Sequence, residues 1–193
     1  MRLEVLDRGH RLATKALFAL IRLMTRQPVS PIVKLIAYRP DYFGGPMKKI
    51  THEAMRGSST WSVGDRELMA AFVSQVNACQ FCIKAHTAVA ARAYGDPAKV
   101  AAALADPDKA PISQPLRATL EFLRKLTRDQ TVGADDVRML LAAGVFPEQV
   151  EDALAVGFAF NTINRLADAF DFLVPGPEAF EAGAKFLLAH GYR

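Results

Sequence analysis

The sequence predicts an all-α protein of about eight helices, and three observations support this fold class. Its 193 residues are 51% hydrophobic, which is enough to bury one sizeable core and is unlike the composition of a disordered chain. Signals for the start and the end of a helix recur along the chain. No segment shows the alternating polar and apolar residues of a half-buried strand. We therefore expect one helical domain over residues 31–193, preceded by an N-terminal arm over residues 1–30.

The arm of residues 1–30 is basic and has the pattern of an amphipathic helix. The net charge of the chain is +4, and residues 1–26 supply all of it. Basic and apolar side chains separate onto two stripes at helical spacing, the first with Arg8, Arg11, Lys15, Arg22 and Arg26 and the second with Ala13, Leu17, Leu20, Leu23 and Met24. We expect this helix to pack on its own protein or on a partner subunit, with a membrane-surface helix as the alternative. Because the remaining chain is electrically balanced, no nucleic-acid partner is expected.

The helical domain shows five helix starts and four helix stops. A cap residue or a first-turn proline opens each start, at Ser30-Pro31, Ser62 to Asp65, Asp96-Pro97, Phe146-Pro147 and Gly176-Pro177. Each stop is a glycine, at Gly57, Gly95, Gly144 and Gly191. A leucine stripe predicts a core-facing helix after Pro115, with Leu116, Leu120, Leu123 and Leu126 on that face. Residues 105–115 are the expected internal linker, which is too short to separate two independent domains.

Two segments of the domain have matching patterns. When residues 65–90 are laid over residues 147–172, three polar or thiol residues of each segment share the spacing i, i+3, i+7: Cys79, Cys82 and His86 fall on Asn161, Asn164 and Asp168, and Glu67 falls on Gln149. We interpret the match as a duplicated helical hairpin, of which one copy holds a redox-capable set. Chance similarity between two alanine-rich helices is the alternative.

Both cysteines of the chain lie in the stretch VNACQFCIKAHTAVA, with a histidine four residues after the second. A disulfide between them would close too short a loop to hold a secreted scaffold together, so the pair indicates chemistry in a reducing compartment. No uninterrupted apolar run approaches the roughly 20 residues that span a bilayer. The apolar stretch ALFALIRLM is split by Arg22 and is followed by no signal-peptide cleavage site. We expect a cytoplasmic protein.

On a helix, Cys79, Cys82 and His86 lie on one face, and Cys82 and His86 form an i, i+4 pair that can exchange a proton. Asn77 is expected to cap a new helix here, which would place the cysteines in its first turns, where the helix dipole favours a thiolate. If the chain folds back near Asn77, Glu67 and His86 face each other across an antiparallel hairpin. The predicted relay runs from Glu67 through His86 to Cys82, and Cys79 lies one turn away to close a disulfide.

Two other interpretations of these residues are open. Two cysteines and one histidine on a helix are often no more than buried core residues. The pattern also supplies three ligands of a zinc site, to which His52 would have to add the fourth. The thiol interpretation requires no metal and no organic cofactor.

The stretch RELMAAFVSQVNACQFCIKAH resembles the core of the AhpD-like alkylhydroperoxidases within the carboxymuconolactone decarboxylase superfamily. The pattern of that family places a glutamate twelve residues ahead of Cys-x-x-Cys-x-x-x-His, and it is matched here by Glu67, Cys79, Cys82 and His86. Residues 38–45 (YRPDYFGG) and 163–170 (INRLADAF) are similar to segments of its peroxidase-related branch. The resemblance covers roughly residues 36–175 and leaves out the N-terminal arm.

The resemblance implies an AhpD-like all-α bundle of helical hairpins, a homo-oligomer, and reduction of hydroperoxides through a reversible Cys79–Cys82 disulfide in which Cys82 attacks. It also implies an external dithiol reductant, either a lipoyl carrier or a thioredoxin-like protein. AhpD itself has a further histidine between the cysteines, where this chain has Gln80 and Phe81. The decarboxylases of the superfamily lack the cysteine pair, so lyase activity is not expected. The alternative function is a non-catalytic oligomeric module whose cysteines sense redox state.

Overall fold

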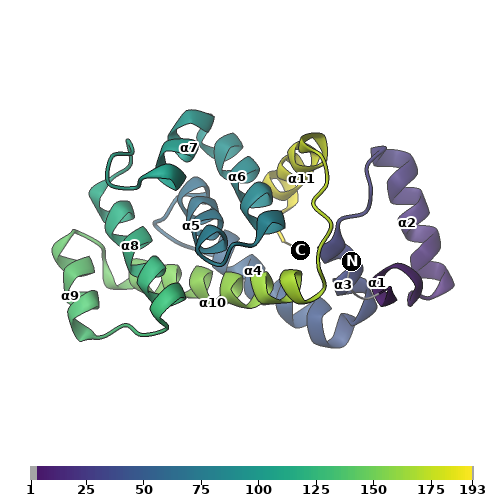
Figure 1. Ribbon diagram of the computed structural model, residues 1–193, viewed down its shortest axis with the longest axis horizontal. Coiled ribbons are helices and arrows are strands. Elements are labelled where there is room, and N and C mark those ends of the chain that lie inside the picture. The colour runs from purple at the N-terminus through teal and green to yellow at the C-terminus, as the bar shows by residue number, and fades with distance from the viewer. Residues whose placement is uncertain (1–3, 193) are drawn as a thin grey trace.

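The computed structural model describes residues 4–192 and shows an all-helical protein, which confirms the predicted fold class (Figure 1). The outer ends of the predicted arm and domain, residues 1–3 and 193, lie outside the described residues. The described part contains eleven α-helices and one short π-helix, against about eight expected. Helices such as α1, with four residues, are too short to show a periodic pattern in the sequence.

The elements follow one another as α1 (Val5–Arg8), α2 (Leu12–Thr25), α3 (Pro31–Tyr38), η1 (Pro40–Gly44), α4 (Gly45–Arg56), α5 (Val63–Val76), α6 (Gln80–Tyr94), α7 (Pro97–Ala105), α8 (Gln114–Asp129), α9 (Ala134–Ala142), α10 (Pro147–Ala169) and α11 (Pro177–His190).

The predicted helix starts and stops are present. Ser62 and Asp65 form a complete capping box, in which each side chain accepts a hydrogen bond from the other residue's backbone N–H at 3.0 Å. Asp96 caps α7 by accepting from the N–H of Lys99. Gly57, Gly95 and Gly191 end their helices, Gly144 follows the end of α9, and residues 106–113 form the predicted linker. Local capping chemistry therefore sets these boundaries.

Helix α5 lies at the centre of the fold and packs against α6, α8 and α10 (Figure 1). It has a run of buried side chains rather than a single apolar stripe, because neighbours cover it on several sides. The predicted leucine stripe of α8 faces this core, with Leu116, Leu120 and Leu123 buried. Helix α11 packs on α6 from the other side. The α5–α6 hairpin is thus enclosed by the rest of the domain.

The hairpin forms as expected, but Asn77 does not cap the second helix. Its backbone N–H bonds to the carbonyl of Val73 and so continues α5, and Asn77 is the residue that ends this helix. Ala78 then takes a left-handed conformation with φ of 58°, and Cys79 becomes the N-cap of α6. The side chain of Asn77 donates instead to Asn161 on α10, over 2.9 Å. The prediction of Asn77 as the cap was wrong by two residues.

The matching segment at residues 147–172 does not form a second hairpin. Its residues up to Ala169 belong to the single helix α10, which runs without a break. Phe160, the counterpart of Ala78, sits within this helix and is buried in the core. The prediction of a second hairpin was therefore wrong: the two segments share the spacing of their polar residues, but only the first segment turns back on itself.

The N-terminal arm divides into a packed part and an unpacked part. Leu6 of α1 is fully buried, and the ring of His10 packs edge-on against Phe18 and Tyr38. Helix α2 has the predicted amphipathic pattern but buries none of its residues, and it lies far from the α5–α6 hairpin (Figure 1). Phe18 and Ile21 are partly covered, but five of its large apolar side chains are exposed, namely Leu12, Leu17, Leu20, Leu23 and Met24. The described part of this chain leaves them uncovered.

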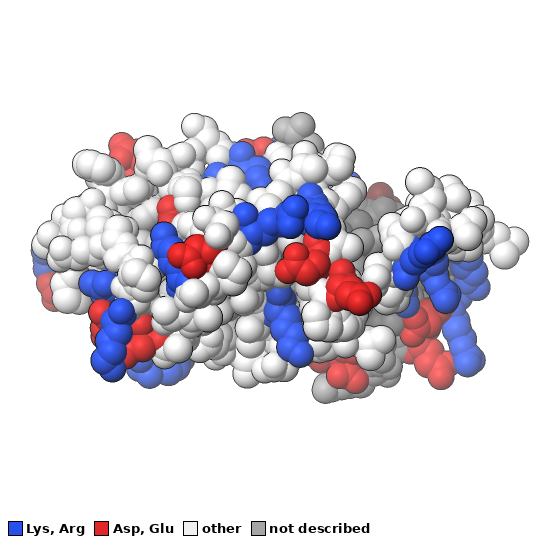
Figure 2. Space-filling view, turned by 90° about the horizontal axis from the view of Figure 1, so that it is seen from above, with Lys and Arg blue, Asp and Glu red and all other residues white. Residues whose placement is uncertain are grey.

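Charged side chains are dispersed over the surface. On the face in Figure 2, acidic and basic groups are interspersed over the body of the molecule, as the balanced charge of that region predicts. None of the helices between residues 4 and 192 combines the length and the apolar character needed to cross a bilayer.

Candidate active site

The α5–α6 hairpin carries the four predicted site residues and brings two pairs of them into contact, Glu67 with His86 and Cys79 with Cys82. Glu67 lies in the second turn of α5, and Cys82 and His86 lie on α6 behind the N-cap residue Cys79. Both cysteines are buried and free of any disulfide. Because Cys79 and Cys82 stand at the N-terminus of α6, the helix dipole favours negative charge at their sulfurs.

Glu67 and His86 make the contact that the hairpin predicts. Oε2 of Glu67 lies 2.7 Å from Nδ1 of His86, and the carboxylate is fully buried. Burial alone would raise the pKa of Glu67, but the hydrogen bond from His86 and the nearby charge of Arg56 outweigh it and hold this pKa below its ordinary value. An ionised Glu67 accepts the Nδ1 proton, so Nε2 of the ring is the nitrogen left to act as a base.

Arg56 and Tyr192 also contact Glu67, and no spacing pattern in the sequence indicates either residue. Nη2 of Arg56 bonds Oε1 of Glu67 at 2.7 Å, and the hydroxyl of Tyr192 donates to the same oxygen at 2.8 Å. The guanidinium carbon of Arg56 lies 5.1 Å from the centre of the Tyr192 ring, within the range of a cation–π contact. Arg56 comes from α4 and Tyr192 follows α11, so only the tertiary fold brings them to α5.

The two thiols act on each other. The hydrogen bond with Cys82 lowers the pKa of Cys79 and outweighs the effect of burial. The same bond, together with burial, raises the pKa of Cys82. Asp168 of α10 also lies close enough to raise the pKa of both. The sequence match paired Asp168 with His86, but it did not reveal that this carboxylate stands beside the cysteines.

Aromatic rings surround the hairpin residues. Phe160 of α10 packs edge-on against His86 with ring centres 4.4 Å apart. Phe81, which lies between the cysteines, packs against Phe172 and Phe180. These rings keep water away from the imidazole and the sulfurs, which strengthens the electrostatic interactions among them.

His52 does not join the cysteines. Its Nδ1 accepts a hydrogen bond from the backbone N–H of Tyr192 at 3.3 Å. Over residues 4–192, no group of three or more His, Cys, Asp or Glu side chains is arranged to hold a metal ion. The zinc interpretation therefore gains no support from the geometry.

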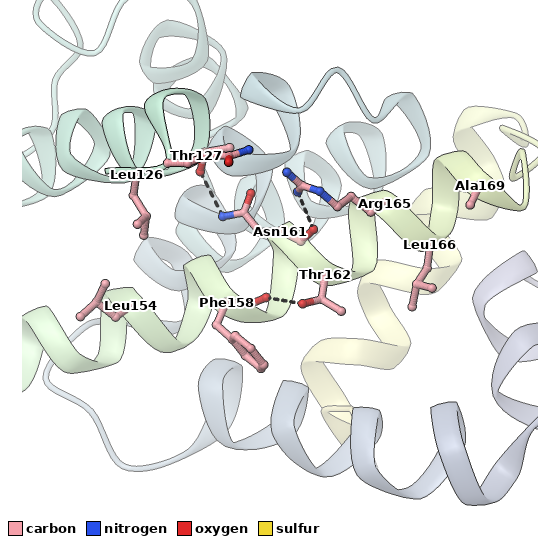
Figure 3. Close-up of a pocket in the computed structure, with 10 residues that line it drawn as sticks. Leu126, Thr127, Leu154, Phe158, Asn161, Thr162, Arg165, Leu166 and Ala169 are labelled. Atoms are coloured by element: carbon pink, nitrogen blue, oxygen red, sulfur yellow. Dashed lines mark hydrogen bonds between the residues drawn. The ribbon is translucent and has the colours of Figure 1, made fainter. Parts of the chain in front are cut away.

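An open groove of about 880 Å³ lies between the end of α8 and the outer face of α10 (Figure 3). Its walls are mainly apolar and include Leu126, Leu154, Phe158 and Leu166, while Asn161 donates to Thr127 across it. None of the four predicted site residues lines this groove. It is a surface feature separate from the thiols.

Comparison with known proteins finds one family model that matches part of the helical core. Residues 47–124 match the model of the carboxymuconolactone decarboxylase family. No curated protein matches the sequence. The matched range spans the α5–α6 hairpin and includes Arg56, Glu67, both cysteines and His86.

Two solved structures show the same fold. An uncharacterized peroxidase-related protein from Silicibacter sp. TM1040 superposes with a TM-score of 0.77 at 23% identity, over 100% of this chain and 95% of that chain. A second structure, named as the alkylhydroperoxidase AhpD core of an uncharacterized peroxidase-related protein from Ralstonia eutropha JMP134, gives 0.74 at 22% identity over 95% and 96% of the two chains. The first match includes the N-terminal arm, which the sequence resemblance left out. Residues 47–124 are therefore similar to the carboxymuconolactone decarboxylase family, and the chain shares the fold of two solved proteins described as peroxidase-related.

Proposed function

We propose that this protein is a thiol-dependent peroxidase or disulfide oxidoreductase that reduces hydroperoxides through a reversible Cys79–Cys82 disulfide. The observation that carries the proposal is the 2.7 Å contact between Glu67 and His86. His86 lies on α6, the same helix that holds Cys82 and is capped by Cys79. A base held by a carboxylate beside a thiol is the arrangement that activates a nucleophile. The names of the two solved structures, both described as peroxidase-related, support this class of reaction.

In the proposed cycle, His86 takes the proton of Cys82 and the resulting thiolate attacks the outer oxygen of the hydroperoxide. The O–O bond breaks, Cys82 becomes a sulfenic acid, and the alkoxide leaves with the proton from His86 as an alcohol. The thiol of Cys79 then displaces the sulfenic oxygen as water and forms the disulfide. An external dithiol, from a lipoyl carrier or a thioredoxin-like protein, reduces the disulfide and is itself oxidised. The cycle uses no metal and no organic cofactor.

We assign the attack to Cys82 because His86 stands four residues after it on α6. The resting hydrogen bond points the other way, since it lowers the pKa of Cys79 and raises that of Cys82. That bond sets which sulfur holds the proton before substrate arrives. Transfer of the Cys82 proton to His86 removes the bond and makes Cys82 the thiolate, so the assignment depends on the relay.

The test is steady-state consumption of a hydroperoxide, with cumene hydroperoxide as the substrate and reduced dihydrolipoamide as the dithiol. We expect many turnovers per chain, and none in the Cys79→Ser/Cys82→Ser variant. Consumption of a single equivalent of peroxide per chain would refute the enzyme. It would support the alternative, a non-catalytic oligomeric module whose cysteines are oxidised once as a redox sensor.

We further propose that the protein works in the cytoplasm, because a reversible cysteine pair needs a reducing compartment to be reset. The described residues contain no helix that could span a bilayer, which agrees with this location.

We also propose that the protein is a homo-oligomer. The apolar face of α2 is exposed, with Leu12 at 85% and Leu23 at 77% of their accessible surface. A second copy would cover such a face, whereas a membrane surface is the other occupant that the basic stripe allows. Light scattering at micromolar concentration should show an oligomer, and deletion of residues 1–26 should weaken it. A monodisperse monomer that binds anionic vesicles would contradict the assembly and favour the membrane.

A further inference from the structure

Tyr192 reaches the relay from a part of the chain that is distant in sequence. Its hydroxyl donates to Oε1 of Glu67 over 2.8 Å and lies 3.5 Å from Nδ1 of His86. His86 contacts the other carboxylate oxygen, Oε2, and Arg56 shares Oε1 with Tyr192. Oε2 of the carboxylate thus bonds His86 within the hairpin, whereas Oε1 bonds Arg56 and Tyr192, which lie outside the hairpin.

Gly191 allows the chain to deliver this tyrosine. Its φ of 67° lies in the left-handed region, and a Cβ there would be 2.9 Å from ring atoms of His52 and 3.2 Å from Cγ of Arg56. The backbone N–H of Tyr192 is in turn bound by His52. The main chain and the ring of Tyr192 are therefore both fixed against α4.

The ring of Tyr192 stands between Glu67 and an open pocket. The pocket has a volume of about 310 Å³ and is lined by Lys48, Lys49, His52, Glu53 and Tyr192. The hydroxyl points the other way, to the fully buried carboxylate. Loss of the hydroxyl alone would remove one hydrogen bond and leave the ring in place as a barrier to water.

We propose that Tyr192 is a positioning residue of the relay, which holds Oε1 of Glu67 and thereby limits how strongly Oε2 attracts the Nδ1 proton of His86. A carboxylate oxygen pair that loses a donor on one side becomes a stronger acceptor on the other. Because it concerns how the Glu67–His86 pair acts on the thiols, this role rests on the proposed function.

Charged and titratable groups from each neighbouring element surround Glu67 and Tyr192. Burial, and then the charge of Glu67, hold the pKa of Tyr192 well above its ordinary value, so the phenol stays protonated and donates. Arg56 and His52 come from α4, and Arg66 comes from α5, where it also interacts with Asp152 of α10. His86, Cys79 and Cys82 come from the α6 side, and Asp168 of α10 lies near the two cysteines. Removal of the Tyr192 hydroxyl leaves all their charges unchanged.

The test is proton NMR of the reduced protein with Tyr192→Phe. A ring N–H that donates to a buried carboxylate gives a far-downfield resonance, and a stronger acceptor moves it further downfield. We expect this shift in Tyr192→Phe and an upfield shift in Glu67→Gln, while His86→Gln removes the signal and so assigns it. Gly191→Ala, which displaces Tyr192 from Glu67, should repeat the downfield shift.

A second readout follows the consequence at the thiol. The pH midpoint of iodoacetamide alkylation of Cys82, measured on its own peptide by mass spectrometry, should fall in Tyr192→Phe and rise in Glu67→Gln. A more basic carboxylate stabilises the imidazolium that forms when His86 takes the thiol proton. Opposite signs in the two variants distinguish tuning from a general loosening of the site, which would move both midpoints upward.

Tyr42→Phe is the matched control, because Tyr42 is 68% exposed and its substitution removes the same atom. Tyr42→Phe should change neither the chemical shift of the His86 ring N–H nor the pH midpoint of Cys82 alkylation. An unmoved resonance in Tyr192→Phe, or an upfield shift like that of Glu67→Gln, would overturn the proposal. The NMR measurement involves no peroxide, so it tests the positioning role separately from the enzyme activity. If the expected shifts are seen but no hydroperoxide is turned over, the peroxidase proposal is refuted and the positioning role of Tyr192 is retained.

Discussion

The α5–α6 hairpin and helix α10 begin from the same spacing of polar residues and fold in different ways. In the hairpin, the chain turns back at Ala78, whose φ is 58°, before it reaches Cys79. In α10, the counterpart Phe160 is helical and buried, and the chain continues straight. The i, i+3, i+7 pattern determines which residues share a helix face. It does not determine whether a turn precedes that face.

The matched residues of α10 are partners of the hairpin. Asn161 accepts a hydrogen bond from Asn77 at the turn, Asn164 accepts one from Ser74 of α5, and Asp168 lies beside the thiols. One segment carries the two thiols, and the other contacts and supports the segment that carries them. This division of roles can be tested residue by residue.

The largest expected difference between the two segments is in activity. Cys82→Ser should abolish hydroperoxide consumption, whereas Cys79→Ser should complete the first step and stop with a sulfenic acid on Cys82. Dimedone trapping, followed by mass spectrometry, reads out the modified residue. The matched substitutions Asn161→Ser and Asn164→Ser should keep turnover, since neither amide takes part in thiol chemistry. A sulfenic acid on Cys79 in Cys82→Ser, with rapid peroxide loss, would reverse the assignment.

Sequence reasoning recovered the hairpin, the capping boundaries and the Glu67–His86 pair, because each of these depends on residues close together along the chain. A capping box fixes the start of α5, and the count of residues on each side of the turn brings Glu67 opposite His86. Arg56 and Tyr192 could not be found in this way. Their contacts depend on how α4 and α11 pack, which no local pattern specifies.

The N-cap of α6 could not be predicted from local sequence alone. Asn77 is a good helix cap by residue type, but its side-chain amide donates to Asn161 on α10 and its backbone N–H donates to the carbonyl of Val73. The competing partners come from the tertiary fold and from the previous helix. The same limitation hid Asp168, which pattern matching assigned to a copy of the site rather than to the site itself.

The second prediction concerns stability. Asn164 is fully buried and accepts a hydrogen bond from Ser74 at 3.1 Å, so Asn164→Ala should destabilise the protein by about 1–3 kcal/mol through the lost hydrogen bond and the lost packing. Urea unfolding measures this loss. The alkylation profile of Cys82 should stay unchanged. Asn161→Ala, at a partly buried position, is the milder comparison, and an equal or larger loss there would contradict the supporting role of Asn164.

The third prediction concerns the carboxylate of the hairpin. Glu67→Gln should raise the apparent pKa for alkylation of Cys82 by about one, because the imidazolium loses a charge partner worth about 1.4 kcal/mol. Gln149→Glu adds a charge at the matched position of α10 and should leave the profile as it is. Superimposable profiles for the parent and Glu67→Gln would mean that Glu67 has no part in the chemistry.

Glu67 should also make stability depend on pH. Since folding lowers the pKa of Glu67, its ionised form stabilises the native state above the pKa of an unfolded glutamate, and this contribution is lost as the pH falls through the lower folded value. The stability difference between the parent and Glu67→Gln should therefore narrow as the pH falls from about 6 toward 3. Chemical unfolding at several pH values checks the trend, and a constant difference would contradict it.

The smallest expected effect lies at the turn that separates the two segments. Ala78 is a non-glycine residue at positive φ, a conformation that costs a residue with a Cβ roughly 1–2 kcal/mol. Ala78→Gly removes this strain but adds backbone freedom to the unfolded chain, so a net gain of about 0.5–1 kcal/mol is expected. Ala155→Gly is the matched control within α10, because Ala155 is exposed like Ala78, and the same change there should cost about 0.5–1 kcal/mol in a helix interior. Urea unfolding of both variants measures the two changes. Opposite signs would show that Ala78 is strained in the turn that separates the hairpin from the straight helix, whereas a loss of stability in both would mean that Ala78 is not strained.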